Sequence, residues 1–134
     1  MHRVVARRRM GYEHEVEMRE HRLIVDEPED LGGRDQGPKP SELLAASLAT
    51  CSAITIEMYA DRKGWELGDV EVEVEFTEAS SDTPASFGVK VRIPAELDAD
   101  QHRRILTIVA KCPVHRVLSA DNVEIYDELE LAEA

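Results

Sequence analysis

The chain has 134 residues, 43% of them apolar, which is enough to bury the core of one folded domain. Its formal net charge is −12, and a surface this acidic repels DNA, RNA and anionic lipid. We therefore expect a single domain over residues 1–134, with no nucleic-acid partner and no membrane partner.

The first ten residues, MHRVVARRRM, carry charges but no apolar run behind them, so they do not resemble a secretory signal. The longest stretch without charge, Leu43 to Ile56, has 14 residues, whereas a membrane-spanning helix needs about 20. Two cysteines without a signal favour a reducing cytoplasm. There a cysteine pair is more often catalytic, redox-active or inert than a structural disulfide.

The first half of the chain predicts strands, a loop and a long helix. Arg7, Arg8 and Arg9 are interpreted as a solvated edge. Weak alternation predicts one or two strands from residue 13 to residue 26, and the glycines and prolines of 26–40 predict a loop. Residues 41–63 predict a helix of about six turns that ends at Gly64.

The second half predicts a hairpin, two helices and a last strand. The alternation of valine and glutamate over 69–76 predicts a strand with one wet face, and 87–93 completes a hairpin. Residues 98–111 predict a helix capped by Asp98 or Asp100, 112–120 a short helix, and 122–131 a final strand. The order β–α–β–β–α–β with mostly hairpin connections predicts an α+β fold.

The long helix is apolar on almost every side between Leu43 and Ile56. Its small polar residues can bond back to the helix backbone; these are Ser47, Thr50, Ser52 and Thr55. A helix that is apolar all round must be covered on all sides, and one small sheet covers one face only. We therefore predict a homodimer in which a second copy supplies the missing cover.

The two cysteines occupy different kinds of position. Cys51 lies on an apolar stripe of the long helix, where a cysteine considered alone is most often a small buried residue. Cys112 precedes Pro113, which suits the first position of a new helix, so Cys112 is the predicted N-cap. The free N–H groups of that helix would stabilise a thiolate, which predicts the lower pKa for Cys112. The alternative is that Pro113 merely separates two core helices and that Cys112 fills space.

The sequence resembles the OsmC/Ohr-like family, the osmotically inducible and organic hydroperoxide resistance proteins. The resemblance lies in GPKPSELLAASLATCSAITIEMYADRKGW and in CPVHRVLS, whose cysteine follows Cys51 by 61 residues. It covers nearly the whole chain and is nearer to the general OsmC-like branch than to the two peroxidase branches. It implies an OsmC-like fold in which antiparallel sheets pack around long central helices in an intertwined homodimer.

The resemblance also implies a function. The family suggests a thiol peroxidase that reduces organic hydroperoxides or peroxide. Cys51 would be the peroxidatic thiolate and Cys112 the resolving thiol, and an external dithiol would reduce their disulfide. No metal or organic cofactor is implied.

Two supporting residues are candidates by their place near the long helix. The peroxidase branches have a glutamate ten residues before the first cysteine, where this chain has Ser41 and then Glu42. Glu42 could instead be a first-turn residue favoured by the helix dipole. The family's arginine from the N-terminal hairpin has no clear equivalent, so Arg34 in the loop is the substitute candidate, with a solvent-facing arginine as the alternative.

Two other functions stay open at this stage. The first is a non-enzymatic dimeric domain that binds a small hydrophobic molecule at its interface. The second is a metal site formed by Cys51, Cys112 and His115, which would supply only three ligands.

Overall fold

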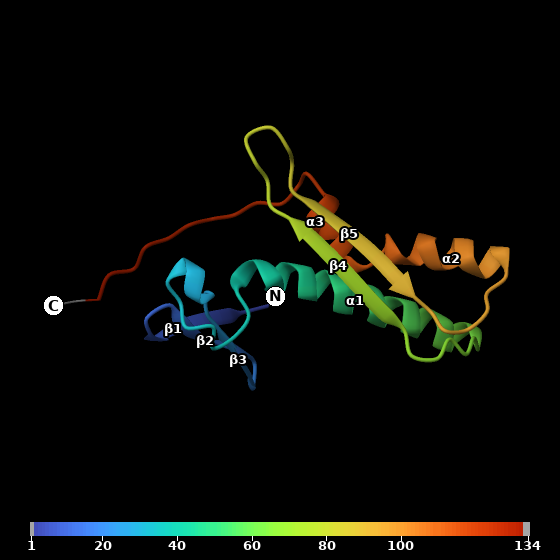
Figure 1. Cartoon of the computed structure of the whole chain (residues 1–134), viewed down its shortest axis with the longest axis horizontal. Coiled ribbons are helices and arrows are strands. Elements are labelled where there is room, and N and C mark those ends of the chain that lie inside the picture. Colours follow the sequence, from blue (N-terminus) through green and yellow to red (C-terminus); the bar gives the residue numbers. More distant parts are fainter. Residues whose placement is uncertain (1, 133–134) are drawn as a thin grey trace.

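The computed structural model describes residues 2–132 as two small antiparallel sheets, one long helix and two shorter helices (Figure 1). The elements in chain order are β1 (Val4–Met10), β2 (Glu13–Met18), β3 (His21–Val25), a 3₁₀ turn η1 (Glu29–Leu31), α1 (Pro40–Lys63), β4 (Glu71–Thr77), β5 (Ser86–Arg92), α2 (Ala99–Val109) and α3 (Pro113–Ser119). The predicted α+β class is confirmed.

A proline and a glycine set the ends of α1. Pro40 occupies the first turn, where its fixed φ suits a helix and its missing N–H costs nothing. Gly64 caps the other end with a φ of 72°, a left-handed conformation that glycine adopts without strain. The helix predicted over residues 41–63 is therefore confirmed.

Only one stripe of α1 is buried within the chain. Its members recur every four residues, and they are Leu48, Ser52, Ile56 and Ala60. Elsewhere on the helix Ile54 is 51% exposed and Met58 is 58% exposed. By length and composition alone α1 could cross a membrane, although core helices of soluble proteins meet the same criterion. Much of its apolar surface is thus left uncovered by its own chain.

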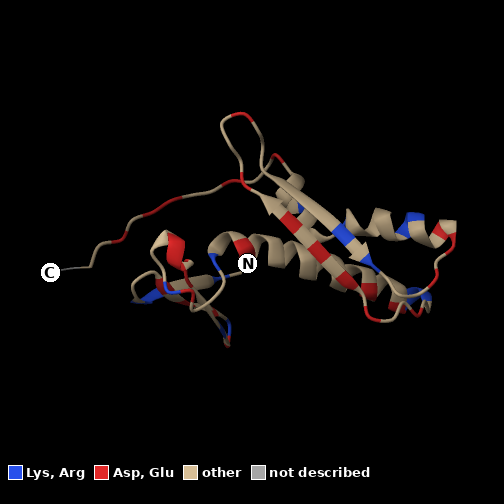
Figure 2. Ribbon diagram, viewed as in Figure 1, with Lys and Arg blue, Asp and Glu red and all other residues tan. Residues whose placement is uncertain are grey.

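The hairpin of β4 and β5 covers one side of α1, as Figure 1 shows. Its inward row includes Phe76 and Phe87, whose rings stack with centroids 4.7 Å apart. Glutamates of β4 form the outward row, and Arg92 of β5 pairs with two of them (Figure 2). The predicted hairpin with one wet face is confirmed. The core beneath it is formed by Ile56, Ala60, Leu67, Ile105 and Val109.

A capping box fixes the start of α2. The Asp98 carboxylate accepts a hydrogen bond from the backbone N–H of Gln101 at 2.8 Å, and the Gln101 side chain accepts one from the Asp98 N–H at 3.1 Å. Asp98, not Asp100, is therefore the N-cap. Asp100 in the first turn pairs with Arg104 at 2.9 Å.

The N-terminal sheet has one strand more than the sequence pattern predicts. The strands expected over 13–26 are β2 and β3, but Val4–Met10 also forms a strand, with the order β1-β2-β3. The predicted exposure of Arg7, Arg8 and Arg9 is confirmed, but the sequence analysis did not predict that they lie on a strand. The strand forms because β1 pairs with β2, where Arg7 meets Glu17 at 2.7 Å, and such a pairing has no local signal.

The strand predicted over 122–131 is absent from this chain, and that prediction is wrong for the chain alone. Residues 121–132 have no regular secondary structure, and each of them is exposed. A strand needs a neighbour for its backbone N–H and C=O groups, and no described strand lies beside this segment.

Gly37→Ala is expected to destabilise the protein by about 3 kcal/mol, the upper end for inserting atoms into a packed site. A Cβ atom on residue 37 would lie 2.1 Å from the carbonyl oxygen of Ile24 and 2.7 Å from its carbonyl carbon. Denaturant titration measures the loss. Gly88→Ala is the control, because a Cβ there meets nothing closer than 4.0 Å. Equal midpoints for the two variants would contradict the prediction.

Candidate active site

The two cysteines meet where α3 packs against α1. Cys51 lies midway along α1, next to the buried stripe, and is partly exposed. Cys112 is the N-cap of α3, as predicted, and is 0% exposed. Pro113 starts α3 and turns the chain at Cys112, so that the two thiols come into contact.

The contact shifts the pKa values of the two thiols in opposite directions. Burial and the hydrogen bond with Cys112 raise the pKa of Cys51. Burial also raises the pKa of Cys112, but hydrogen bonds from Cys51 and from the N–H groups of His115 and Val114 outweigh it, so that the pKa of Cys112 is lowered. Of the two thiols, Cys112 is therefore the more acidic. This agrees with the direction expected from its position at the start of α3.

Two hydroxyl residues contact the thiols and were missed as site residues by the sequence analysis. Ser52 is 0% exposed, and its hydroxyl helps to lower the pKa of Cys112. The Thr55 hydroxyl also acts to lower the pKa of Cys51, but its effect is smaller than that of burial, which raises this pKa. Their neighbours on the helix behave as predicted, since Ser47 and Thr50 donate to the backbone carbonyls of Leu44 and Ala46 at 2.8 Å.

Ser52 differs from these neighbours because it does not bond back to the helix. Its Oγ is buried and has no hydrogen-bond partner in the described part of the chain. A buried hydroxyl without a partner costs free energy, and Ser52 lies close enough to Cys112 to lower the pKa of that thiol. The signal that could have found it is its place one residue beyond Cys51 on the buried stripe.

The two candidate supporting residues have other partners within one chain. Glu42 accepts a hydrogen bond from the Lys39 N–H at 3.0 Å and so closes the first turn of α1. Arg34 donates to the buried Glu13 carboxylate at 2.5 Å, and Arg9 pairs with the same carboxylate at 3.2 Å. The support that either gives to Cys51 stays a prediction.

No group of three histidine, cysteine, aspartate or glutamate side chains converges for a metal ion within residues 2–132. The structure brings Cys51 and Cys112 together, but it does not complete a ligand set with His115.

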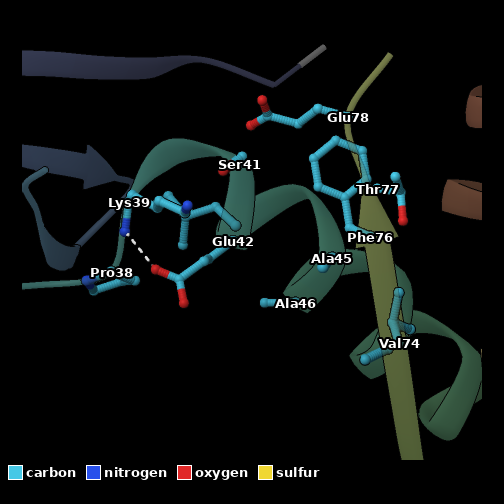
Figure 3. A pocket seen from close by; sticks show the side chains of 12 residues that line it. Pro38, Lys39, Ser41, Glu42, Ala45, Ala46, Val74, Phe76, Thr77 and Glu78 are labelled. Atoms are coloured by element: carbon cyan, nitrogen blue, oxygen red, sulfur yellow. Dashed lines mark hydrogen bonds between the residues drawn. The ribbon is translucent and has the colours of Figure 1, made fainter. Parts of the chain in front are cut away.

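A groove of about 890 Å³ opens between the first turns of α1 and the end of β4 (Figure 3). Alanines of α1 line one wall, and Val74 and Phe76 line the other. Glu42 and Glu78 stand near its ends. The groove is therefore mostly apolar in its middle and charged at its rims, where Lys39 lies beside Glu42.

A family model described as OsmC-like protein matches residues 33–126, a range that contains both cysteines and every element from α1 to α3. The chain belongs to the OsmC-like protein family. No curated protein is detectably similar to this OsmC-like protein in sequence.

Solved structures share the fold of this OsmC-like protein. A protein of Psychrobacter arcticus 273-4 named for osmotic stress induction and detoxification response has a TM-score of 0.77 and 21% identity, with 88% of each chain covered. An organic hydroperoxide resistance protein OsmC of Legionella pneumophila has a TM-score of 0.66 and 22% identity, with 90% of each chain covered. The organic hydroperoxide resistance protein OhrB of Bacillus subtilis has a TM-score of 0.60 and 21% identity, covering 90% of this chain and 92% of that one. At these identities the likeness establishes the fold.

Proposed function

We propose that this OsmC-like protein is a thiol-dependent peroxidase that reduces organic hydroperoxides or peroxide through Cys51 and Cys112 in oxidative stress defence. The observation that carries the proposal is the contact between the two thiols, one partly exposed and one fully buried. Neighbours named for organic hydroperoxide resistance support it.

The proposed reaction uses the pair in its singly ionised form. The Cys51 sulfur attacks the outer oxygen of ROOH, the O–O bond breaks, and Cys51 becomes a sulfenic acid. The departing RO⁻ takes the proton of the Cys112 thiol and leaves as ROH. The Cys112 thiolate then attacks the sulfenic sulfur, forming the disulfide and releasing hydroxide, which takes a proton from solvent to become water. An external dithiol reduces the disulfide and is itself oxidised.

Exposure in the single chain supports an attack by Cys51, even though its pKa is raised. A peroxide must reach the sulfur, and Cys112 is 0% exposed whereas Cys51 is partly exposed. The two thiols influence each other's ionisation, and we propose that the Cys51 proton passes to Cys112, so that the charge lies on the accessible sulfur when the peroxide is in place. Arg34 and Glu42 are proposed as supporting residues.

We further propose that residues 1–134 form one OsmC-like domain that works as a homodimer in the cytoplasm. The uncovered apolar residues of α1 support the homodimer, since exposing such a surface to water is unfavourable. Light scattering at micromolar concentration tests it, and a monomer would remove this part of the proposal.

The function is tested by treating the reduced protein with one equivalent of an organic hydroperoxide. We expect one equivalent of the alcohol and the loss of two free thiols per chain, and turnover when a dithiol is added. Unchanged thiols and no alcohol would overturn the proposal.

The same experiment decides the alternative, a domain that binds a small hydrophobic molecule. The raised pKa of Cys51 and the groove of about 890 Å³ favour that alternative. Unreactive thiols, together with saturable binding of an apolar dye that Phe76→Asp removes, would support it.

The rate of the first reaction with hydroperoxide should rise with pH and reach half its maximum below the ordinary cysteine pKa. The pair loses its first proton early because the pKa of Cys112 is lowered. In Cys112→Ser the remaining thiol is Cys51, whose pKa burial raises, so the midpoint should move to higher pH. Stopped-flow rates across the pH range check this. A midpoint that does not move would contradict it.

A further inference from the structure

Ser52 carries a fully buried hydroxyl that the fold leaves without a hydrogen-bond partner. It follows Cys51 in α1 and is 0% exposed, and its Oγ has no partner within residues 2–132. An unpaired buried hydroxyl costs free energy, and alanine would fill nearly the same volume without that cost. The packing of the fold therefore gives no reason for a serine at this position, and a role in the chemistry of the site would explain it.

The neighbourhood of Ser52 contains the resolving thiol. Ser52 lies on the buried stripe of α1, and α3 packs against α1 (Figure 1). Cys112, the N-cap of α3, is also 0% exposed, and Ser52 is one of the groups that favour its thiolate. A hydroxyl hydrogen rotates to suit a new acceptor. Ser52 is therefore free to donate to the Cys112 sulfur without losing another hydrogen bond.

The proposed reaction places a negative charge on Cys112 at two stages. In the singly ionised pair the charge lies on Cys112, the more acidic thiol. It passes to Cys51 for the attack and returns when RO⁻ takes the proton of the Cys112 thiol. Because Cys112 has no exposed surface, solvent does not hydrate this charge. A buried thiolate then depends on the hydrogen-bond donors that surround it.

We propose that Ser52 is a positioning residue of the peroxidase, whose hydroxyl donates a hydrogen bond to the Cys112 sulfur whenever that sulfur carries the charge. It favours the resolving step, in which the Cys112 thiolate attacks the sulfenic sulfur of Cys51 and hydroxide leaves. A donor that is placed before the charge arrives needs little reorganisation. Ser52 acts through Cys112 and does not touch the peroxide. The inference deepens the proposed function and rests on it.

The charged and titratable groups near Cys112 have other positions or act through the backbone. Lys111 and Arg116 are exposed. His115 contributes its backbone N–H, and its ring Nδ1 has no hydrogen-bond partner among the described residues. On α1 the titratable neighbour is Cys51, which is the other reacting thiol. Ser52 thus supplies a side-chain donor that takes no part in the bond changes of the reaction.

Ser52→Ala should change the rate of the resolving step in opposite directions at low and high pH. Loss of one hydrogen bond to a charged group should lower the acid dissociation constant of Cys112 about tenfold. Below the wild-type midpoint less thiolate forms, so the disulfide should form about threefold more slowly. In alkaline buffer, where Cys112 is ionised in both proteins, the more basic thiolate should react about threefold faster. Acid quenching after one equivalent of hydroperoxide, followed by mass spectrometry, measures both rates.

The change of sign separates this role from a purely structural one, because a displaced Cys112 would resolve more slowly at every pH. Ser47→Ala is the control. Ser47 is exposed on the same helix and donates to the Leu44 carbonyl at 2.8 Å, so its removal should leave the wild-type profile. A Ser52→Ala profile that equals the wild type, or that is slower at every pH, would overturn the proposal.

A titration without hydroperoxide separates this inference from the proposed function. In a Cys51→Ala background Cys112 is the one remaining thiol of the chain, and the ultraviolet absorbance of its thiolate reports its ionisation. Ser52→Ala should move the midpoint of this titration to higher pH. An unchanged midpoint would overturn the role of Ser52 and leave the peroxidase standing. A raised midpoint in a protein whose wild type leaves hydroperoxide intact would refute only the peroxidase.

The stability of the reduced protein in acidic buffer gives a further readout. Ser52→Ala removes an unpaired hydroxyl and places a better helix former in α1, so the urea midpoint should equal or exceed that of the wild type. A lower midpoint would show that the hydroxyl already stabilises the resting fold, and it would overturn the proposal.

Discussion

Cys51→Ser should abolish the reduction of organic hydroperoxides, with a fall of roughly a thousandfold or more, as expected when the attacking atom of a site is removed. Cys51 is the accessible member of the pair, and Cys112 has no exposed surface through which a peroxide could reach it. A serine hydroxyl at position 51 is not ionised near neutral pH and does not attack an O–O bond. The alcohol formed from the hydroperoxide, measured by chromatography, gives the result.

The control for this variant is Thr50→Ser on the neighbouring helix position. Thr50 is exposed, and its hydroxyl donates to the Ala46 carbonyl, a bond that serine can keep. The control should react like the wild type. If Cys51→Ser still consumed one equivalent of hydroperoxide, Cys112 would be the attacking thiol and the two roles would be exchanged.

Much of the fold follows from local patterns. Pro40 and Gly64 mark the ends of α1, the alternation of valine and glutamate gives β4, and Pro113 separates α2 from α3. Each of these signals acts within a few residues. The α+β class and the element boundaries near the cysteines could therefore be read from the sequence.

The features that the sequence could not predict depend on pairing between segments that are distant in the chain. β1 exists because of β2, and its arginines, considered alone, indicate only an exposed edge. Residues 122–131 show the reverse case, since their alternation predicts a strand and the described part of the single chain offers no partner. Local pattern specifies the face that a strand presents, but a neighbour decides whether the strand forms.

The candidate site likewise combines features that local sequence predicts with features that depend on the packing of distant segments. The N-cap position of Cys112 follows from Pro113, and the N–H groups of His115 and Val114 near that position contribute to lowering its pKa. The contribution of Ser52 does not follow from local sequence, because it requires that α3 pack on the face of α1 that carries this hydroxyl. The contact between the thiols likewise arises from the packing of two helices that lie far apart in sequence.

Cys112→Ser should leave one fast reaction with hydroperoxide and then stop. Cys51 can still attack, since it is the accessible sulfur, but no second thiol is available to resolve the sulfenic acid. We expect one alcohol per chain, loss of the single remaining thiol, and an adduct with a 1,3-diketone reagent at Cys51 by mass spectrometry. The wild type should instead lose both thiols and give no adduct, because its disulfide forms first.

The environment of residue 112 makes serine a fair replacement. The site already contains the buried Ser52 hydroxyl and the N–H groups of Val114 and His115, so a hydroxyl at position 112 finds hydrogen-bond partners. We therefore expect the variant to keep the native fold, and circular dichroism checks this. Continued turnover by Cys112→Ser with a dithiol would show that the external reductant resolves Cys51 directly. Cys112 would then affect only the ionisation of Cys51, and the pH midpoint of the first reaction would be the property that its removal changes.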